Sequence, residues 1–305
     1  MRKTAAMIFA LCAVLAGLTG PPALASPDDL TSTTAAARWV DVDTVTLANG
    51  LTLEYAETGH GRGQVVIFLH GYTDSWFSWS RVLRQLPPRF HGYALSQRGH
   101  GDSERPAAGY EVSDFAADVI AFMDHFGIRK AALVGHSMGS VIAQRVAIDH
   151  PDRISKLVLV GATPNAANEV ILGLLDFVNT LEDPIDPAFV RDFQASTVFQ
   201  PIPETFLDRV VAESLKVPAR VWQDALQGLV AEDTTAELAE IKVPTLIVWG
   251  NQDTVFPLTD QQALANGIPR ARLLIYPRTG HGVHWERPQR FTQDLVDFLR
   301  RPVRR

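Results

Sequence analysis

A serine flanked by glycines, in the stretch Gly135-His136-Ser137-Met138-Gly139, limits the folds open to this chain. The apolar run 131–134 before it has the character of a short buried strand, and residues 140–150 after it form a helical pattern. A serine at such a strand-to-helix turn is the pattern of a nucleophile elbow, in which a strained turn lifts the hydroxyl clear of a sheet. Side chains at Gly135 and Gly139 would collide with the neighbouring strand or helix, so glycine is expected there.

Strands and helices alternate on both sides of this turn. A hairpin at 40–55 comes first, and further strands are predicted at 65–69, 93–95, 131–134, 156–160, 244–249 and 273–276, with a helix at 75–86 among the intervening ones. Such alternation predicts a doubly wound, mostly parallel α/β sheet, in which ligands bind beyond the carboxyl ends of the strands. His70, Ser137 and Gly161 all follow predicted strand ends.

Between residues 164 and 240 the strand pattern stops. Helical patterns separated by prolines take its place, at 168–181, 187–195, 203–215 and 218–230. We therefore expect a helical cap at 164–240, inserted into a core formed by residues 38–163 and 241–301. Several apolar cap residues could pack inside the cap or face a pocket.

The amino terminus has the pattern of a secretory signal. Arg2 and Lys3 precede an apolar run at 5–18, and Ala23-Leu24-Ala25 is a small-x-small cleavage site. We expect cleavage after Ala25, a flexible lead-in at 26–37, and a secreted or periplasmic protein without a stable membrane anchor. An uncleaved anchor is the alternative, but the apolar run is short for a membrane span.

The amino-acid composition argues against thiol chemistry and against a nucleic-acid partner. The single cysteine, Cys12, lies in the signal, so we expect no disulfide and no thiolate chemistry in the mature chain. Loss of Arg2 and Lys3 would leave 26 Lys and Arg against 34 Asp and Glu, a net charge of −8. That charge argues against a nucleic-acid partner. The sequence does not indicate an oligomeric state.

A serine hydroxyl needs a base to take its proton and an acid to orient that base. Asp253 follows the predicted strand after the cap, and His281 follows the last predicted strand. The chain order Ser, Asp, His distinguishes one serine-hydrolase fold from the others.

Five stretches in order resemble the α/β-hydrolase fold superfamily, in particular its capped serine esterases, lipases and C–C hydrolases. They are Leu69-His70-Gly71-Tyr72, Gln97-Arg98-Gly99-His100-Gly101-Asp102-Ser103, Gly135-His136-Ser137-Met138-Gly139, Trp249-Gly250-Asn251-Gln252-Asp253 and Gly280-His281-Gly282-Val283-His284-Trp285-Glu286-Arg287-Pro288. The resemblance extends from about residue 40 to residue 300. It implies an eight-stranded, mostly parallel sheet with the helical cap inserted after the sixth strand.

The resemblance also implies the site residues. Ser137 corresponds to the nucleophile, Asp253 to the acid and His281 to the base, with backbone N–H groups of Tyr72 and Met138 as the oxyanion hole. His284 competes with His281, and the pair could suggest a metal, but no third ligand is visible at a matching spacing. The family's spacing from the glycine selects His281, and Glu286 is then expected to begin the next helix. Neither a cofactor nor a metal is expected.

The pocket is harder to predict than the triad. Trp76, Trp79, His136 and Trp222 are candidates to line it, with ordinary core packing as the alternative for the tryptophans. The apolar cap favours a small apolar ester or lactone as substrate.

These features together predict a secreted serine hydrolase that cleaves a carboxylic ester or lactone through an acyl-enzyme. A C–C bond hydrolase or a cofactor-free haloperoxidase would use the same triad. A ligand-binding protein with a slow triad is a further alternative, because fold does not fix function. Epoxide hydrolases and haloalkane dehalogenases also resemble this chain, but they are disfavoured because they carry an aspartate where Ser137 stands.

Overall fold

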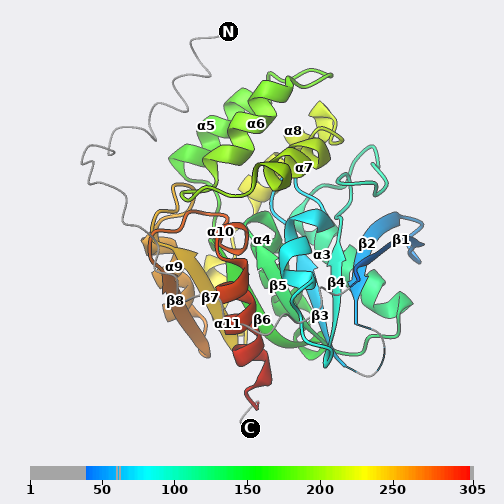
Figure 1. Ribbon diagram of the computed structural model, residues 1–305, viewed down its shortest axis with the longest axis vertical. Helices are drawn as coiled ribbons and strands as arrows, with labels where there is room; N and C mark the ends of the chain where they lie inside the picture. Colours follow the sequence, from blue (N-terminus) through cyan, green and yellow to red (C-terminus); the bar gives the residue numbers. More distant parts are fainter. Residues whose placement is uncertain (1–38, 60, 62, 303–305) are drawn as a thin grey trace, which may run out of the picture.

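The computed structural model describes residues 39–302, except residues 60 and 62. The predicted signal at 1–25 and the lead-in at 26–37 lie outside the described residues (Figure 1). None of the described helices combines the length and apolar character that a bilayer span requires.

The described chain is built on one sheet of eight strands, in the order β1-β2-β4-β3-β5-β6-β7-β8. Strand β2 is antiparallel to β1 and to β4, and every other pairing is parallel. The expected eight-stranded, mostly parallel sheet is therefore confirmed. The strands are β1 (Asp41–Thr46), β2 (Thr52–Thr58), β3 (Gln64–Leu69), β4 (Phe90–Leu95), β5 (Ala131–His136), β6 (Ile154–Val160), β7 (Thr245–Gly250) and β8 (Ala271–Tyr276).

Successive side chains of the central strands point to opposite faces of the sheet. In β3, Ile67 and Leu69 join a core with helices α3 (Val112–His125), α4 (Met138–Asp149) and α9 (Leu258–Gly267). Val66 and Phe68 join the core on the other face, with α2 (Ser80–Leu83) and α11 (Pro288–Arg300). Apolar side chains on both faces explain why these strands read as continuous apolar runs in the sequence.

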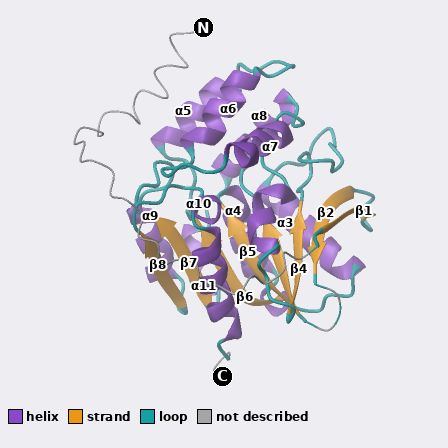
Figure 2. Ribbon diagram, viewed as in Figure 1, coloured by secondary structure: helices purple, strands orange, loops and turns teal. Residues whose placement is uncertain are grey.

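Four helices form the cap after the sixth strand. They are α5 (Glu169–Val178), α6 (Pro187–Ser196), α7 (Glu204–Ser214) and α8 (Ala219–Ala231), and they gather at one end of the sheet (Figures 1 and 2). Pro187 is the first residue of α6, while Pro203 and Pro218 precede α7 and α8. Proline is favoured at helix starts because its fixed φ suits a first turn that has no N–H partner.

The helix predicted at 75–86 was wrong in type and length. A 3₁₀ turn, η2 (Trp76–Trp79), comes first, and only Ser80–Leu83 is α-helical. Ser75 caps η2 by accepting a hydrogen bond from the Phe77 N–H at 3.2 Å. This local bond favours a tight first turn over a continuous α-helix.

A buried ion pair ties the loop after β4 to helix α3. The Arg98 guanidinium donates from Nε to Asp118 Oδ2 at 2.6 Å and from Nη2 to Asp118 Oδ1 at 2.7 Å. Asn49 Nδ2 also donates to Asp118, and Arg98 Nη1 donates to the Gly109 carbonyl. Both charged side chains are largely buried, so each depends on the other for compensation.

Replacing Asp118 by alanine is expected to lower the free energy of unfolding by roughly 3 kcal/mol, because the buried Arg98 guanidinium keeps only the more distant Asp114, 3.9 Å away, as a counter-charge. Denaturant unfolding measures the change. Asp124→Ala is the matched control on the same helix, since Asp124 is exposed and paired with Arg153. It should cost less than about 1 kcal/mol. Equal losses in the two variants would contradict the expectation.

Candidate active site

Ser137 lies at a strained turn between β5 and α4. Its backbone adopts φ 51° and ψ −121°, outside the regions that residues with side chains favour. A Cβ at Gly135 would lie 2.1 Å from the Gly139 carbonyl oxygen, and one at Gly139 would lie 2.4 Å from the Leu69 oxygen. The close packing expected of both glycines is therefore present.

Asp253 and His281 form a buried pair beyond the ends of β7 and β8. His281 Nδ1 lies 2.8 Å from Asp253 Oδ2. Asp253 Oδ1 accepts hydrogen bonds from the N–H groups of Val255 and Phe256, at 2.8 and 3.1 Å. With the carboxylate fixed in this way, the proton of a neutral His281 belongs on Nδ1, and Nε2 is left as the basic nitrogen.

Ser137 and His281 line the same cavity. No hydrogen bond joins their side chains in the described residues. Bonds between a nucleophile and its base are often long before substrate binds, and they tighten in the complex. The arrangement can therefore supply a nucleophile, a base and an orienting acid to a molecule in this cavity.

His284 lies in a different environment from His281. Its ring stacks on Trp79 with centroids 4.0 Å apart, and neither ring nitrogen has a hydrogen-bond partner among the described residues. Burial lowers the pKa of His284 well below its usual value, helped by nearby His281 and Arg81. The described residues also contain no group of three or more His, Cys, Asp or Glu that could hold a metal.

The backbone segments of the predicted oxyanion hole lie side by side. Met138 is the first residue of α4, where a helix has N–H groups without intrahelical partners. Gly139 packs against the carbonyl oxygens of Leu69 and His70, which brings the start of α4 to the segment that contains Tyr72. The Tyr72 hydroxyl donates to the Trp222 carbonyl oxygen of the cap at 2.5 Å.

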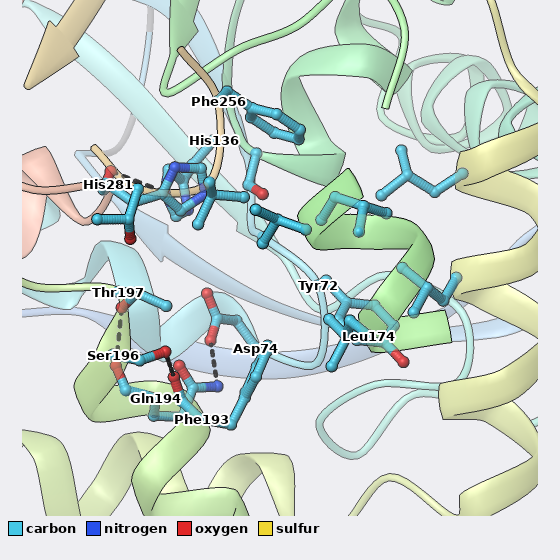
Figure 3. A pocket seen from close by; sticks show the side chains of 18 of the residues that line it. Tyr72, Asp74, His136, Leu174, Phe193, Gln194, Ser196, Thr197, Phe256 and His281 are labelled. Atoms are coloured by element: carbon cyan, nitrogen blue, oxygen red, sulfur yellow. Dashed lines mark hydrogen bonds between the residues drawn. The ribbon is translucent and has the colours of Figure 1, made fainter. Parts of the chain in front are cut away.

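The cavity, of about 110 Å³, lies between the cap and the ends of the strands (Figure 3). Most of its wall is apolar. The apolar residues come from the cap, from the loop after β7 and from the short helix that follows His281: Val170, Ile171, Leu174, Phe177, Phe189, Phe193, Leu226, Leu229, Val255, Phe256 and Trp285.

Of the four predicted pocket residues, only His136 is among those that line this cavity. Trp79 is fully buried against Phe68 and His284. Trp222 is also fully buried, and its ring packs against Tyr72, Phe189 and Phe193. Trp76 lies in the core on one face of the sheet. Trp222 therefore supports the cavity from behind its wall, whereas Trp76 and Trp79 belong to the core.

Glu286 has a position that the sequence did not indicate. It ends the short helix α10 (Val283–Glu286) rather than beginning the next one. Its Oε1 accepts from the N–H groups of Gly280 at 2.7 Å and Phe199 at 3.0 Å, and its Oε2 accepts from that of Gln200 at 2.9 Å. Glu286 thus joins the loop of His281 to the connection between α6 and α7.

Replacing Glu286 by alanine is expected to lower kcat/KM by about 100-fold, because small displacements of a catalytic group carry rate costs of this size. Steady-state kinetics on a p-nitrophenyl ester, the substrate class expected from the sequence, measures the effect. Glu204→Ala is the control, since Glu204 is an exposed cap glutamate that pairs with Arg191. Equal activity in the Glu286 and Glu204 variants would contradict the expectation.

The sequence and the structure are similar to those of several known proteins. The sequence profile of the alpha/beta hydrolase fold matches residues 64–288. A 2-hydroxy-6-oxononadienedioate/2-hydroxy-6-oxononatrienedioate hydrolase of Paraburkholderia phymatum is 31% identical, over 89% of this chain and 99% of the relative. A non-heme chloroperoxidase of Streptomyces lividans is 28% identical, over 84% and 99%. The crystal structure of a bacterial membrane phospholipase A has a TM-score of 0.73 at 28% identity, over 85% and 86%.

Proposed function

This chain belongs to the alpha/beta hydrolase family, and from that premise we propose that it is a serine hydrolase that cleaves a carboxylic ester or lactone through an acyl-enzyme. One observation carries the proposal. Ser137, on its strained turn, opens onto the same apolar cavity as His281, whose Nδ1 is held by Asp253 at 2.8 Å. A serine nucleophile, a base and a buried acid that orients the base are groups that acyl transfer requires.

In the proposed reaction, Ser137 Oγ attacks the ester carbonyl carbon while His281 Nε2 accepts the hydroxyl proton. Asp253 stabilises the imidazolium, and the N–H groups of Tyr72 and Met138 bind the oxyanion. Collapse of the tetrahedral intermediate breaks the bond to the alcohol, which leaves with the proton of His281. A water molecule, deprotonated by His281, then attacks the acyl-enzyme and frees the acid and Ser137.

The wall of the cavity favours an apolar ester over the substrate in the name of the Paraburkholderia relative. That substrate is a dioate, so it carries two carboxylates. Burial of a carboxylate is costly unless a cationic side chain pairs with it. The described residues that line the cavity include neither lysine nor arginine. C–C bond hydrolysis and cofactor-free halogenation remain second candidates, because one relative is named as a hydrolase of an oxo-dioate and another as a non-heme chloroperoxidase.

A substrate panel tests the proposal. We expect turnover of p-nitrophenyl esters of graded acyl length or of lactones, and slower turnover of a vinylogous diketone and in a halogenation assay. A fluorophosphonate should label one residue, and mass spectrometry of the peptides should locate the adduct on Ser137. Ester turnover without labelling of Ser137, or selective turnover of the diketone, would overturn the proposal.

We further propose that residues 1–25 direct export. The support is the sequence pattern of two basic residues, an apolar run and a small-x-small site. Expression in a Gram-negative host should give an extracytoplasmic protein that begins at Ser26 by intact mass. A full-length chain confined to the cytoplasm would contradict this.

A further inference from the structure

Asp74 is the one residue with a carboxyl side chain among the described residues that line the cavity. It follows Tyr72 and Thr73, and Thr73 turns the chain with a positive φ of 65°. The Asp74 residue is only 3% exposed, yet its carboxyl group points into the cavity (Figure 3). A buried carboxyl group in an apolar wall is costly unless it makes specific hydrogen bonds.

The cap holds this carboxyl group in place. Gln194, a buried residue of α6, donates from Nε2 to Asp74 Oδ1 at 3.1 Å. The same Nε2 lies within hydrogen-bond distance of Thr73 Oγ1, at 3.3 Å, and of Ser214 Oγ on α7, at 2.8 Å. Gln194 therefore links two cap helices to the segment that follows Tyr72, and it fixes one of the two Asp74 oxygens.

The second Asp74 oxygen, Oδ2, has no side-chain hydrogen-bond partner among the described residues. Burial raises the pKa of Asp74 well above its usual range, against the opposing effects of Gln194 and a backbone hydrogen bond with Gly71. The other titratable groups of the cavity wall are Tyr72, His136 and His281. Burial raises the pKa of Tyr72 and lowers that of His136, so both stay neutral near pH 7. Since Oδ1 accepts from Gln194, Oδ2, which lies beside the Gly71 backbone in the cavity wall, is the oxygen left to carry the proton of a neutral Asp74.

We propose that Asp74 is a specificity-determining residue, which donates a hydrogen bond to an ether, keto or hydroxyl oxygen placed a few bonds from the scissile carbonyl. The proposal rests on the proposed ester hydrolysis and specifies its substrate class. The preferred substrates are esters or lactones that are apolar apart from such an oxygen. Plain alkyl esters would leave the buried donor without a partner, and sites built around a hydrogen bond discriminate strongly against substrates that lack it.

The competing explanation is that Asp74 only ties its segment to the cap. If Asp74 only anchors its segment, its replacement lowers kcat/KM for all substrates equally. If Asp74 recognises the substrate, its replacement changes the ratio of kcat/KM between two matched substrates. The ratio of kcat/KM values within a substrate pair is therefore the decisive measurement.

Two nearly isosteric variants separate these roles. Asp74→Asn can still accept from Gln194 and donate an amide N–H to the substrate, while Asp74→Leu keeps the branched shape and the number of heavy atoms and loses both the donor and the acceptor. One substrate pair, p-nitrophenyl methoxyacetate and p-nitrophenyl butyrate, places the oxygen in the acyl part. The other, 2-methoxyethyl and butyl acetate, places it in the alcohol part. Each ratio is normalised to the hydroxide-catalysed rates.

We expect the native enzyme to prefer the oxygenated member of at least one pair by about tenfold or more. Asp74→Asn should keep most of that preference, and Asp74→Leu should abolish it while still hydrolysing the plain ester. Equal loss on both members in Asp74→Leu, or an unchanged ratio, would overturn the inference. Thermal unfolding of each variant shows whether it is folded.

The proposed function and this inference fail in different ways. Ester turnover that depends on Ser137 but shows no change of ratio in Asp74→Leu refutes the inference alone. If no ester is turned over, the proposed function fails. Recognition by Asp74 is then measured with two p-nitrophenyl phosphonates that differ only in their butyl or 2-methoxyethyl group. The measured quantity is the rate at which each compound inactivates the protein. A preference for the methoxyethyl compound that Asp74→Leu removes supports the inference, and equal rates or no inactivation overturn it.

Discussion

Replacing Ser137 by alanine is expected to lower kcat for ester hydrolysis by roughly 10⁶-fold, the loss seen when a serine nucleophile is removed from a triad. The variant keeps the elbow, the His281–Asp253 pair and the cavity, so binding should persist while the acyl-enzyme cannot form. What activity remains would come from the oxyanion hole and from substrate positioning. Burst kinetics and steady-state turnover on the best p-nitrophenyl ester measure the effect.

Ser196→Ala is the matched control for this variant. Ser196 lines the same cavity, but its hydroxyl donates to the Phe193 carbonyl at 2.7 Å and belongs to the cap helix α6. Its replacement should change kcat by less than about twofold, in line with the small effects of substitutions away from reacting groups. More than 1% of native activity in purified Ser137→Ala would show that another group performs the reaction.

On acidification from pH 7 to pH 5.5, buried histidines are expected to lower the free energy of unfolding by roughly 5 kcal/mol, and a protonated Asp74, which binds its proton only in the folded chain, offsets part of that loss. The cause is a set of four buried histidines: His70, His100, His136 and His284. Burial is the largest cause that lowers the pKa of each, to about 4 for His100 and well below the usual value for the other three.

The sign follows from proton binding. Below the unfolded histidine pKa of about 6.5, the unfolded chain takes up protons that these four rings do not bind in the folded protein. Their contribution to stability is therefore complete above that pH and is lost progressively as the pH falls. Each ring contributes up to about 1.4 kcal/mol per pH unit between its folded and unfolded pKa values.

Urea unfolding at intervals between pH 7 and pH 5.5 measures this loss. His284→Phe keeps an aromatic ring against Trp79 and should remove about a quarter of the pH dependence, since His284 is one of four equivalent contributors. His125→Gln is the control, because His125 is exposed on α3, and it should leave the dependence unchanged. A stability that stays constant down to pH 5.5 would contradict the expectation.

Most of the fold could be predicted because its signals are local. Strands buried on both faces read as unbroken apolar runs, and prolines mark the starts of the cap helices at Pro187, Pro203 and Pro218. The pairing of Asp253 with His281 could be anticipated as well, because both follow strands whose carboxyl ends meet at one edge of the sheet. The region 75–86 was mispredicted because a hydrogen bond from the Phe77 N–H to the Ser75 side chain competes with its helical pattern.

The cavity wall could not be predicted in the same way. An apolar helix residue faces either the cavity or the core, and sequence spacing does not distinguish the two when the helix packs on several sides. Trp222 accordingly lies behind the wall, whereas Leu226, one turn further along α8, lines it. Asp74 and Gln194 are 120 residues apart, and no local pattern links them.

The three backbone N–H groups held by Glu286 have a consequence for protein engineering. Two of them, from Phe199 and Gln200, belong to the cap, and the third, from Gly280, precedes the catalytic histidine candidate. A cap transplanted from a relative would keep this geometry only if its own chain offered two N–H groups at the same place. Chimeras should therefore exchange the α6–α7 connection and residues 280–286 together. The junctions between the two parent sequences should lie outside both of these segments.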